Sequence, residues 1–209
     1  MPRNPSTECG QLLPLDPFVS QRPTPTDAPR LNLGCGTDIR AGWVNLDSSD
    51  QIPGVDVVHD LEVRPFPFAD GAFAFILAQD VLEHMTNAVA TLRELHRILR
   101  PGGSVRIRVP HFTSRNNFID PTHHHQFAIE WFDFFVVGTQ RKLERPYYFN
   151  FCFTSIAYEH ITFERNFRWQ FYNPAVDWLV NRSRKTRQCF ETTFLRCMPA
   201  DNVVIELRK

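Results

Sequence analysis

The 209-residue sequence lacks net charge, and it lacks any long hydrophobic run. Its 23 basic residues balance 23 acidic ones, so the electrostatic attraction on which nucleic-acid binding depends is missing, and we expect no nucleic-acid partner. No stretch reaches the roughly eighteen apolar residues that a membrane-spanning helix requires, and none has the form of a secretory signal peptide. We therefore expect a cytoplasmic protein without a membrane partner.

Cysteine is also scarce. The five cysteines stand at positions 9, 35, 152, 189 and 197 and include no C-x-x-C pair. This scatter argues against a disulfide framework and against a thiolate zinc site. We interpret the cysteines as reduced residues that mostly serve packing.

The composition indicates one globular domain preceded by an arm. Hydrophobic residues make up 43% of the chain and charged residues 22%, which is ordinary for a domain of this length. Seven prolines fall within the first 29 positions, and such a segment contains too few branched apolar residues to build a core. We predict a flexible N-terminal arm over residues 1–29 and a single domain over residues 30–209.

The most informative motif is a short apolar strand that runs into two glycines, Gly34 and Gly36. Glycine allows a backbone to approach a ligand closely and to adopt positive φ. A second predicted strand, over residues 43–46, leads to Asp47, whose carboxylate can accept both hydroxyls of a ribose. The third glycine of the dinucleotide fingerprint is missing, because position 39 is Ile. The pattern therefore favours a nucleoside ligand over a pyrophosphate.

Further strands and a helix follow in regular order. Residues 57–60 are predicted to form a third strand that stops at Asp60. Residues 72–78 form an apolar run suited to a strand buried on both faces, and Asp70 and Gly71 are a turn signal before it. Residues 86–100 have helical spacing, with Val89, Leu92 and Leu99 on one stripe. Pro101, Gly102 and Gly103 are predicted to end that helix before a strand over residues 104–109.

The same segments resemble the class I S-adenosylmethionine (SAM) dependent methyltransferases, particularly the small, single-domain methyltransferase type 11-like group. The resemblance rests on Leu-Asn-Leu-Gly-Cys-Gly at 31–36, Val-Leu-Glu-His at 81–84 and Arg-Pro-Gly-Gly at 100–103. It implies SAM as cofactor. In this family the acid at Asp60 accepts a hydrogen bond from the adenine amino group. The cofactor-binding residues implied are Asn32, Gly34, Cys35, Gly36, Leu46, Asp47, Asp60, Leu61, Gln79 and Asp80.

The resemblance and the alternation of elements predict an α/β fold of the Rossmann-like, seven-stranded methyltransferase type. Its sheet would be doubly wound and mostly parallel, with the ligand at the carboxyl ends of the strands. Only about ten residues join the first two strands, so any helix there is short. A C-terminal antiparallel strand pair is expected from residues 203–207 and a partner within 161–171. Residues 174–180 are predicted to begin a helix, and the basic run 182–187 to form a solvated loop.

An aromatic-rich stretch over residues 111–172 is not explained by the general fold. It holds 12 of the 19 phenylalanines and all four tyrosines. We predict that residues 111–160 form a cap over the substrate region, because an aromatic-lined cavity suits a small organic acceptor. The alternative is that most of these aromatics form a secondary core.

Histidines are the candidate catalytic groups: His84, His111, His123 and His125. A histidine can remove a proton from a hydroxyl or amine acceptor at neutral pH. We expect no resident metal; the alternative is a site at His123 and His125 completed by His111 or Asp120. A third interpretation is structural, with Asp120, Pro121 and Thr122 starting a helix. Glu83 is expected to be a structural hydrogen-bond acceptor.

The leading functional hypothesis is SAM-dependent methyl transfer to an oxygen or nitrogen atom of a small or medium organic acceptor. Because a sulfonium methyl is already electrophilic, the protein mainly has to position the acceptor and exclude water. Two alternatives stay open. One is a catalytically inactive binding subunit with the same fold, and the other is a metal-assisted methyltransferase that uses the histidine cluster.

Overall fold

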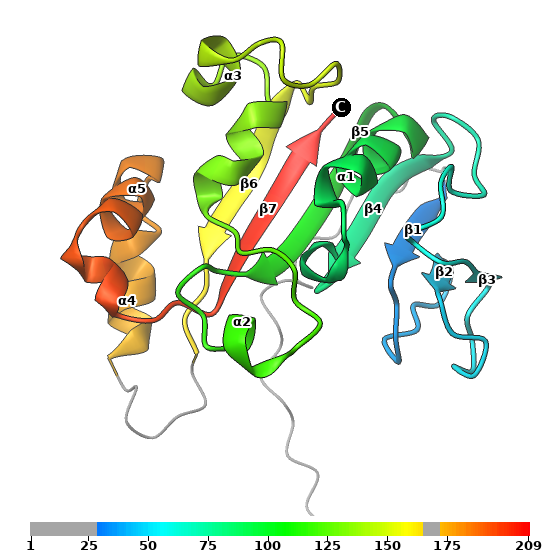
Figure 1. Cartoon of the computed structure of the whole chain (residues 1–209), viewed down its shortest axis with the longest axis horizontal. Helices are drawn as coiled ribbons and strands as arrows, with labels where there is room; N and C mark the ends of the chain where they lie inside the picture. Colours follow the sequence, from blue (N-terminus) through cyan, green and yellow to red (C-terminus); the bar gives the residue numbers. More distant parts are fainter. Residues whose placement is uncertain (1–28, 165–171) are drawn as a thin grey trace, which may run out of the picture.

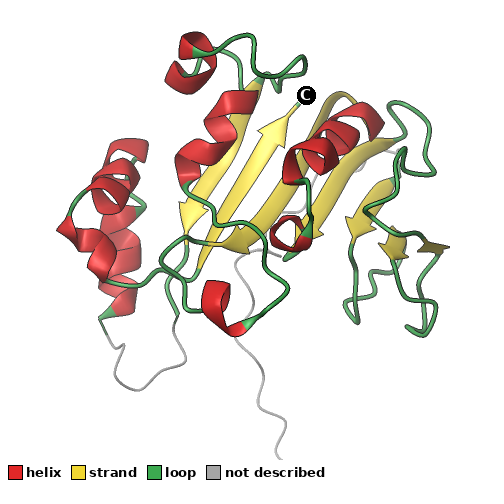
Figure 2. Cartoon of the chain, viewed as in Figure 1, coloured by secondary structure: helices red, strands yellow, loops and turns green. Residues whose placement is uncertain are grey.

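The computed structural model describes residues 29–164 and 172–209, which form a single sheet flanked by helices (Figures 1 and 2). The predicted arm over residues 1–29 lies outside the described residues, apart from Pro29. The sheet has seven strands in the order β3-β2-β1-β4-β5-β7-β6. Their bounds are β1 Arg30–Leu33, β2 Val44–Asp47, β3 Val57–Val58, β4 Phe73–Gln79, β5 Leu99–Pro110, β6 Ser155–Ile161 and β7 Asn202–Arg208.

The strand directions confirm the predicted fold class. Strands β1 to β5 pair in parallel, whereas β7 runs antiparallel to both β5 and β6. The order reverses between β1 and β4, where Leu33 lies opposite Ala78. In an open α/β sheet, this switch point leaves a crevice beyond the carboxyl ends of the strands.

All helices in the described part of the chain belong to the segments after β4. The α-helices are α1 Ala88–Ile98, α2 Asn116–Ile119, α3 Gln140–Glu144, α4 Asn173–Val180 and α5 Arg184–Thr192, and the 3₁₀ helices are η1 Leu82–His84, η2 Ile129–Phe135 and η3 Phe194–Cys197. Helix α1 buries Leu92, Leu95 and Ile98 against the sheet, as its apolar stripe predicts. The Asn87 side chain caps its first turn by accepting a hydrogen bond from the Ala90 amide at 2.9 Å.

Two connections differ in detail from the prediction: the end of α1 and the link between β1 and β2. The helix ends at Ile98, and residues 100–103 lie within β5 as an irregular stretch. The pairing with β4 shifts there, from Phe73 opposite Leu99 to Phe75 opposite Ser104. Gly102, at φ 74°, supplies a conformation that other residues rarely adopt. The ten residues between β1 and β2 form turns and contain no helix.

Two C-terminal predictions were wrong. The partner of β7 is β6, which ends at Ile161, the first residue of the segment predicted for it; residues 165–171 lie outside the described chain. The basic run is not a solvated loop, because it begins α5. Arg184 contacts Asp133 and Glu159 at 2.5 and 2.8 Å, and Arg187 contacts Glu159 at 2.8 Å. These basic residues therefore tie α5 to η2 and β6.

The aromatic-rich stretch mainly builds a second part of the core. Phe127, Phe132, Phe135 and Phe153 are at most 1% exposed. Phe127 stacks on Phe132 with ring centroids 5.9 Å apart. The structure thus supports the secondary-core interpretation for these four phenylalanines.

No helix within residues 29–164 and 172–209 combines the length and the apolar character that crossing a bilayer would demand.

Candidate active site

Two polar cavities lie at the carboxyl ends of the parallel strands. The smaller, of about 430 Å³, is lined by Asn32, Gly34, Cys35, Thr37, Asp38, Arg40, Gln79, Asp80 and Arg108. The larger, of about 480 Å³, is lined by Asp80, Glu83, His84, Arg108, Pro110, Asn116, Ile119, Asp120, His123, Asp201 and Asn202. Asp80 and Arg108 belong to both linings, so the cavities meet at this pair.

The glycine loop borders the smaller cavity. Gly34 and Gly36 have φ values of 61° and 47°, in the left-handed region that glycine adopts without strain. A Cβ at Gly34 would lie 2.6 Å from a methyl of Val81, so the loop can pass this side chain only as glycine. A Cβ at Gly36 would meet nothing within 4 Å, and the backbone there is open to a ligand.

Asp47 fixes the end of this loop. Its Oδ2 accepts a hydrogen bond from the Gly36 amide at 2.8 Å, and its Oδ1 accepts one from the Ser49 amide at 3.2 Å. A carboxylate offers about four acceptor positions, so these two bonds leave room for further donors. Asp47 therefore anchors the loop and remains able to receive hydroxyls.

Two buried amides support the loop from beneath. The Asn32 amide donates to the Asp38 carbonyl at 2.7 Å, and the Asn45 side-chain oxygen accepts from the Arg40 amide at 2.9 Å. The Arg40 guanidinium in turn donates to the Gln79 side chain at 3.2 Å, which links the loop to the end of β4. Asn32 is only 3% exposed, and its amide is already engaged with the loop.

The predicted cofactor residues fall into two groups. Asn32, Gly34, Cys35, Gln79 and Asp80 come together around the smaller cavity. The remaining predicted residues do not line it. Leu46 and Leu61 are buried in the core, and Asp60 lies in an exposed turn where its side chain accepts from the Glu62 amide. Gly36 belongs to the loop itself, and Asp47 lies beside the loop and binds the Gly36 amide.

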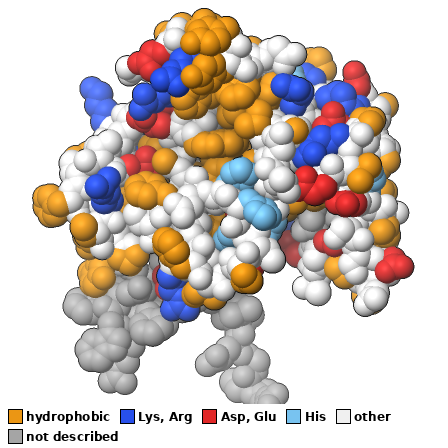
Figure 3. Space-filling model, viewed as in Figure 1, with side chains coloured by type: hydrophobic (Ala, Val, Ile, Leu, Met, Phe, Trp, Pro, Cys, Tyr) orange, Lys and Arg blue, Asp and Glu red, His pale blue; other side chains and the backbone are white. Residues whose placement is uncertain are grey.

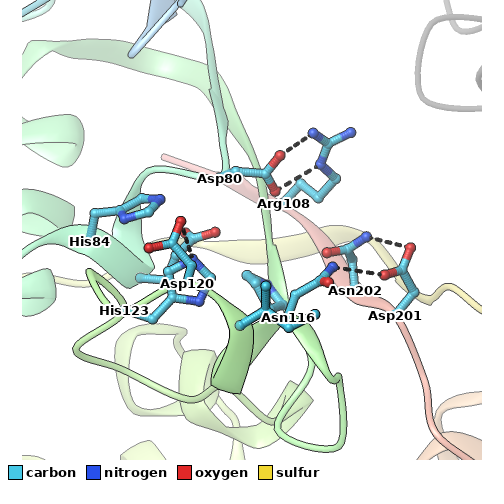
Figure 4. Close-up of a pocket in the computed structure, with 11 residues that line it drawn as sticks. Asp80, His84, Arg108, Asn116, Asp120, His123, Asp201 and Asn202 are labelled. Carbon is cyan, nitrogen blue, oxygen red and sulfur yellow. Dashed lines mark hydrogen bonds and ion pairs between the residues drawn. The ribbon is translucent and has the colours of Figure 1, made fainter.

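Asp80 and Arg108 form the boundary between the cavities (Figure 4). Arg108 Nε donates to Asp80 Oδ1 at 3.0 Å, and a second guanidinium nitrogen contacts Oδ2. Two-point pairs of this kind fix both side chains in orientation. Asp80 also has φ 53°, the one non-glycine residue of the described chain with positive φ. Such backbone conformations concentrate at functional sites.

Glu83, His84 and His123 converge in the larger cavity. One ligand atom from each lies within 4.8 Å of the others, and the rings of His84 and His123 are 4.7 Å apart, edge to face. Glu83 is fully buried, and neither carboxylate oxygen has a hydrogen-bond partner among the described residues. Burial raises the pKa of Glu83 to about 8. The expectation that Glu83 is a structural hydrogen-bond acceptor was therefore wrong.

The segment that carries His123 is a turn rather than a helix start. Asp120 follows α2, and its Oδ1 accepts from the Thr122 amide at 2.8 Å and from the Thr122 hydroxyl at 2.6 Å. No helix begins at Asp120, because this carboxylate closes a turn on Thr122. Burial lowers the pKa of His123, and the nearby His84 acts in the same direction.

His111 and His125 lie apart from this group. His111 is fully buried, and its Nε2 lies 3.1 Å from Glu191 while its Nδ1 accepts from the Thr113 amide at 3.2 Å. With both nitrogens engaged, the geometry favours a structural role for His111. His125 packs its ring 6.2 Å from that of Phe127. Among the described residues, His123 does not share a ligand cluster with either of them.

Cys35 is 4% exposed. Burial, reinforced by the carboxylate of Asp47, raises the pKa of its thiol. A protonated, buried thiol is unreactive, in agreement with its interpretation as a packing residue.

The larger cavity has no phenylalanine, tyrosine or tryptophan among the described residues that line it. An aromatic cavity of about 190 Å³ lies elsewhere, lined by Val89, Trp131, Phe134, Phe135, Tyr148 and Phe149. On the molecular surface, histidine side chains group at the centre of one face, beside a band of hydrophobic side chains (Figure 3). The predicted aromatic lining is therefore not found in the polar cavity next to the glycine loop.

Sequence reasoning missed several lining residues of the larger cavity, namely Arg108, Asn116, Asp201 and Asn202. Arg108 stands near the carboxyl end of β5, and Asp201 directly precedes β7. A polar residue at the end of a predicted strand was a usable signal for Arg108. Asp201 and Asn202 come from the antiparallel strand, and only its position in the sheet brings them to this edge.

Comparison with known proteins agrees with this geometry. Residues 35–107 match the family model described as a methyltransferase domain. This chain has the class I SAM-dependent methyltransferase fold. A SAM-dependent methyltransferase from Archaeoglobus fulgidus matches with 16% identity and a TM-score of 0.56, over 88% of this chain and 87% of that one.

Other solved structures show how widely the fold is used. A Bacillus halodurans structure described as a methyltransferase matches with 15% identity and a TM-score of 0.54, covering 87% of this chain and 92% of its own. The [4+2]-cyclase SpnF matches with 17% identity and a TM-score of 0.50, over 87% of this chain and 75% of that one. None of the curated proteins matches the chain. These likenesses define the fold alone.

Proposed function

We propose that the protein transfers a methyl group from SAM to an oxygen or nitrogen atom of a small or medium polar organic acceptor. The observation that carries this proposal is the junction of two cavities at Asp80 and Arg108. One cavity borders the glycine loop, and the other holds ionisable groups suited to an acceptor. A donor and an acceptor bound on either side of this pair would meet at a single point.

The smaller cavity and the glycine loop beside it fit a nucleoside with a charged tail. The open backbone at Gly36 allows close approach, and Asp47 keeps acceptor positions for ribose hydroxyls. Asp80 and Gln79 stand at the end of β4, where a carboxylate suits an ammonium group. When bound, SAM supplies an electrophilic methyl group on a sulfonium centre.

The larger cavity favours an acceptor that makes hydrogen bonds. Its lining combines carboxylates, amides, imidazoles and a guanidinium, with Pro110 and Ile119 as apolar members. Figure 4 shows His84, Asp120 and His123 grouped on one side, with Asp201 and Asn202 on the other. We assign His84 and His123 as the residues that face the acceptor, because both imidazoles line this cavity.

The protein's task in this reaction is mainly positional. An acceptor held in line with the reacting bond no longer has to find it by collision, and this removes a large part of the free-energy barrier of the bimolecular step. The fixed Asp80–Arg108 pair and the buried Asn32–Asn45 network hold the cavity walls in place.

Isothermal titration with SAM and with S-adenosylhomocysteine tests the cofactor part of the proposal. We expect one site per chain, and no detectable binding would overturn it. A methyl-release assay across hydroxyl, carboxylate and amine acceptors then tests the reaction. Cofactor binding with no turnover on any acceptor class would favour the alternative, a binding subunit that has lost catalysis.

A further inference from the structure

We infer that Glu83, His84 and His123 form a binding site for a divalent transition-metal cation. The inference concerns cation binding alone, so it does not depend on the methyl transfer proposed above. It rests on an unpartnered buried carboxylate, on two imidazoles that each have a ligand atom within 4.8 Å of it, and on a hydrogen-bonded frame that joins the two segments involved.

The buried carboxylate is the first observation. Glu83 is 0% exposed, and both of its side-chain oxygens lack a hydrogen-bond partner among the described residues. Buried polar groups are nearly always satisfied, and those that are not call for an explanation. Ionised, Glu83 has unsatisfied acceptors, and protonated, it has an unsatisfied donor. A cation shared with neighbouring imidazoles would satisfy it.

The second observation is the orientation of His84. Thr122 donates its hydroxyl hydrogen to Asp120 Oδ1 at 2.6 Å, so its oxygen is free to accept from His84 Nδ1 at 2.8 Å. A proton on Nδ1 leaves the lone pair of His84 on Nε2. Metal-binding histidines commonly carry such a hydrogen bond from the nitrogen that does not touch the metal.

His123 is prepared in a similar way. Its Nε2 faces Asp120 Oδ2 at 3.9 Å, and its Nδ1 is buried without a partner among the described residues. A proton on Nε2, toward the carboxylate, would place the lone pair on Nδ1. Asp120 thus orients both imidazoles. It binds the Thr122 hydroxyl that accepts from His84, and its own carboxylate oxygen lies 3.9 Å from Nε2 of His123.

The two segments are also joined through the backbone. The His124 amide donates to the Glu83 carbonyl at 2.7 Å, which fixes the turn after α2 against η1. Thr122 and His84, which are 38 positions apart in sequence, form the second link. The ligand atoms lie within 4.8 Å of one another, and small side-chain movements would bring them to the roughly 2.0–2.2 Å that nitrogen and carboxylate ligands keep from zinc.

The donor set decides the class of cation. Two imidazoles and one carboxylate suit zinc and similar divalent transition metals, whereas magnesium and calcium prefer oxygen ligands. Three protein ligands leave at least one coordination position, and these three residues line the larger cavity. The set differs from the one considered from sequence, because His84 and Glu83 take the places given there to His125 and to His111 or Asp120.

The test uses the full-length, tag-free protein after treatment with EDTA, titrated with Zn²⁺ and separately with Mg²⁺. We expect one Zn²⁺ per chain and at least about 100-fold weaker binding of Mg²⁺. His84→Ala and His123→Ala should each weaken Zn²⁺ binding at least about 100-fold, and Thr122→Val, which removes the orienting hydroxyl, about 10-fold to 100-fold. His124→Ala and His125→Ala are the matched controls from the same tripeptide and should bind Zn²⁺ as wild type does.

Wild-type protein that binds no stoichiometric Zn²⁺, or that binds it no more tightly than the His84→Ala and His123→Ala variants do, would overturn the inference. An equal loss in His125→Ala would also overturn it, in favour of the other histidine set. If a variant fails to fold, the absorption spectrum of Co²⁺ bound to wild-type protein decides the matter: nitrogen and oxygen ligation supports the site, and a spectrum of fully hydrated Co²⁺ contradicts it.

Discussion

The carboxylate of Asp80 and the guanidinium of Arg108 form a two-point ion pair at the place where the two polar cavities meet. Asp80 directly follows β4 and Arg108 lies in β5, so the pair also bridges neighbouring strands at the carboxyl edge. Because both side chains line both cavities, a change in either residue should affect donor and acceptor binding together.

Arg108→Lys keeps the positive charge and removes the two-point geometry. We expect this variant to bind SAM about threefold to tenfold more weakly and to lose turnover to a similar extent, because a partly exposed pair contributes modestly. Titration calorimetry and an activity assay measure the two effects. Arg141→Lys, which alters an exposed pair between α3 and Glu130, is the control; a loss in SAM affinity there as large as in Arg108→Lys would contradict the assignment.

Asp47→Ala removes the carboxylate that anchors the glycine loop and is expected to receive the ribose. We predict a loss of about 1.5–3 kcal/mol in SAM binding, the range for hydrogen bonds to a charged group. Asp47→Asn can still accept the Gly36 amide hydrogen and separates loop anchoring from charge. Unchanged SAM affinity in Asp47→Ala would refute the role of this residue.

Gly34→Ala should destabilise the fold as well as the site. A Cβ there would lie 2.6 Å from a Val81 methyl, at a backbone φ of 61°. We expect the free energy of unfolding to fall by on the order of 1–3 kcal/mol, measured by urea denaturation. Gly138→Ala is the matched control, since it has φ 77° but a Cβ there would meet nothing within 4 Å. Equal losses in the two variants would show that contact with Val81 has no effect.

Glu94 should make stability depend on pH. Burial alone would raise its pKa, but the hydrogen bonds from Arg97 and the Phe66 amide outweigh burial and lower it below 4.5. A group with a lowered pKa stabilises the fold above its unfolded pKa, and this contribution is lost as pH falls through the folded value. Glu94→Gln should therefore destabilise the protein at pH 7 by about 1–3 kcal/mol.

Urea denaturation at a series of pH values checks the sign. The difference between wild type and Glu94→Gln should be constant near neutral pH and shrink as the solution is acidified below pH 4.5. A difference that grows on acidification would contradict the ion pair with Arg97. Arg97 also donates to the Phe68 carbonyl and contacts Asp70, so the same pair holds the loop before β4 against α1.

Much of the fold could be predicted because its signals are local. The glycine pair at Gly34 and Gly36, the apolar run of β4 and the stripe of α1 each follow from backbone freedom, burial and periodicity. The boundary of β5 was harder, because Pro101 and Gly102 usually end a helix and here form an irregular part of a strand. The sequence of β7 predicted a strand, but its pairing with β6 depends on long-range packing.

The candidate site likewise has one part that local sequence signals predict and another that depends on long-range contacts. The loop residues around the smaller cavity are close in sequence to the strands that carry them. Glu83, His84 and His123 come together only because the His124 amide binds the Glu83 carbonyl and Thr122 binds His84. No local pattern in the triple histidine distinguishes His123 from its neighbours, and only the turn closed by Asp120 selects which ring enters the cavity.

A crystal structure of the protein with S-adenosylhomocysteine would show directly whether the cavity beside the glycine loop holds the nucleoside. We expect the nucleoside beside Gly34 and Gly36, with its sulfur directed toward the Asp80–Arg108 pair and the cavity of His84 and His123. A ligand bound at the aromatic cavity of Trp131 and Phe149, or a nucleoside whose sulfur points away from Asp80, would contradict it.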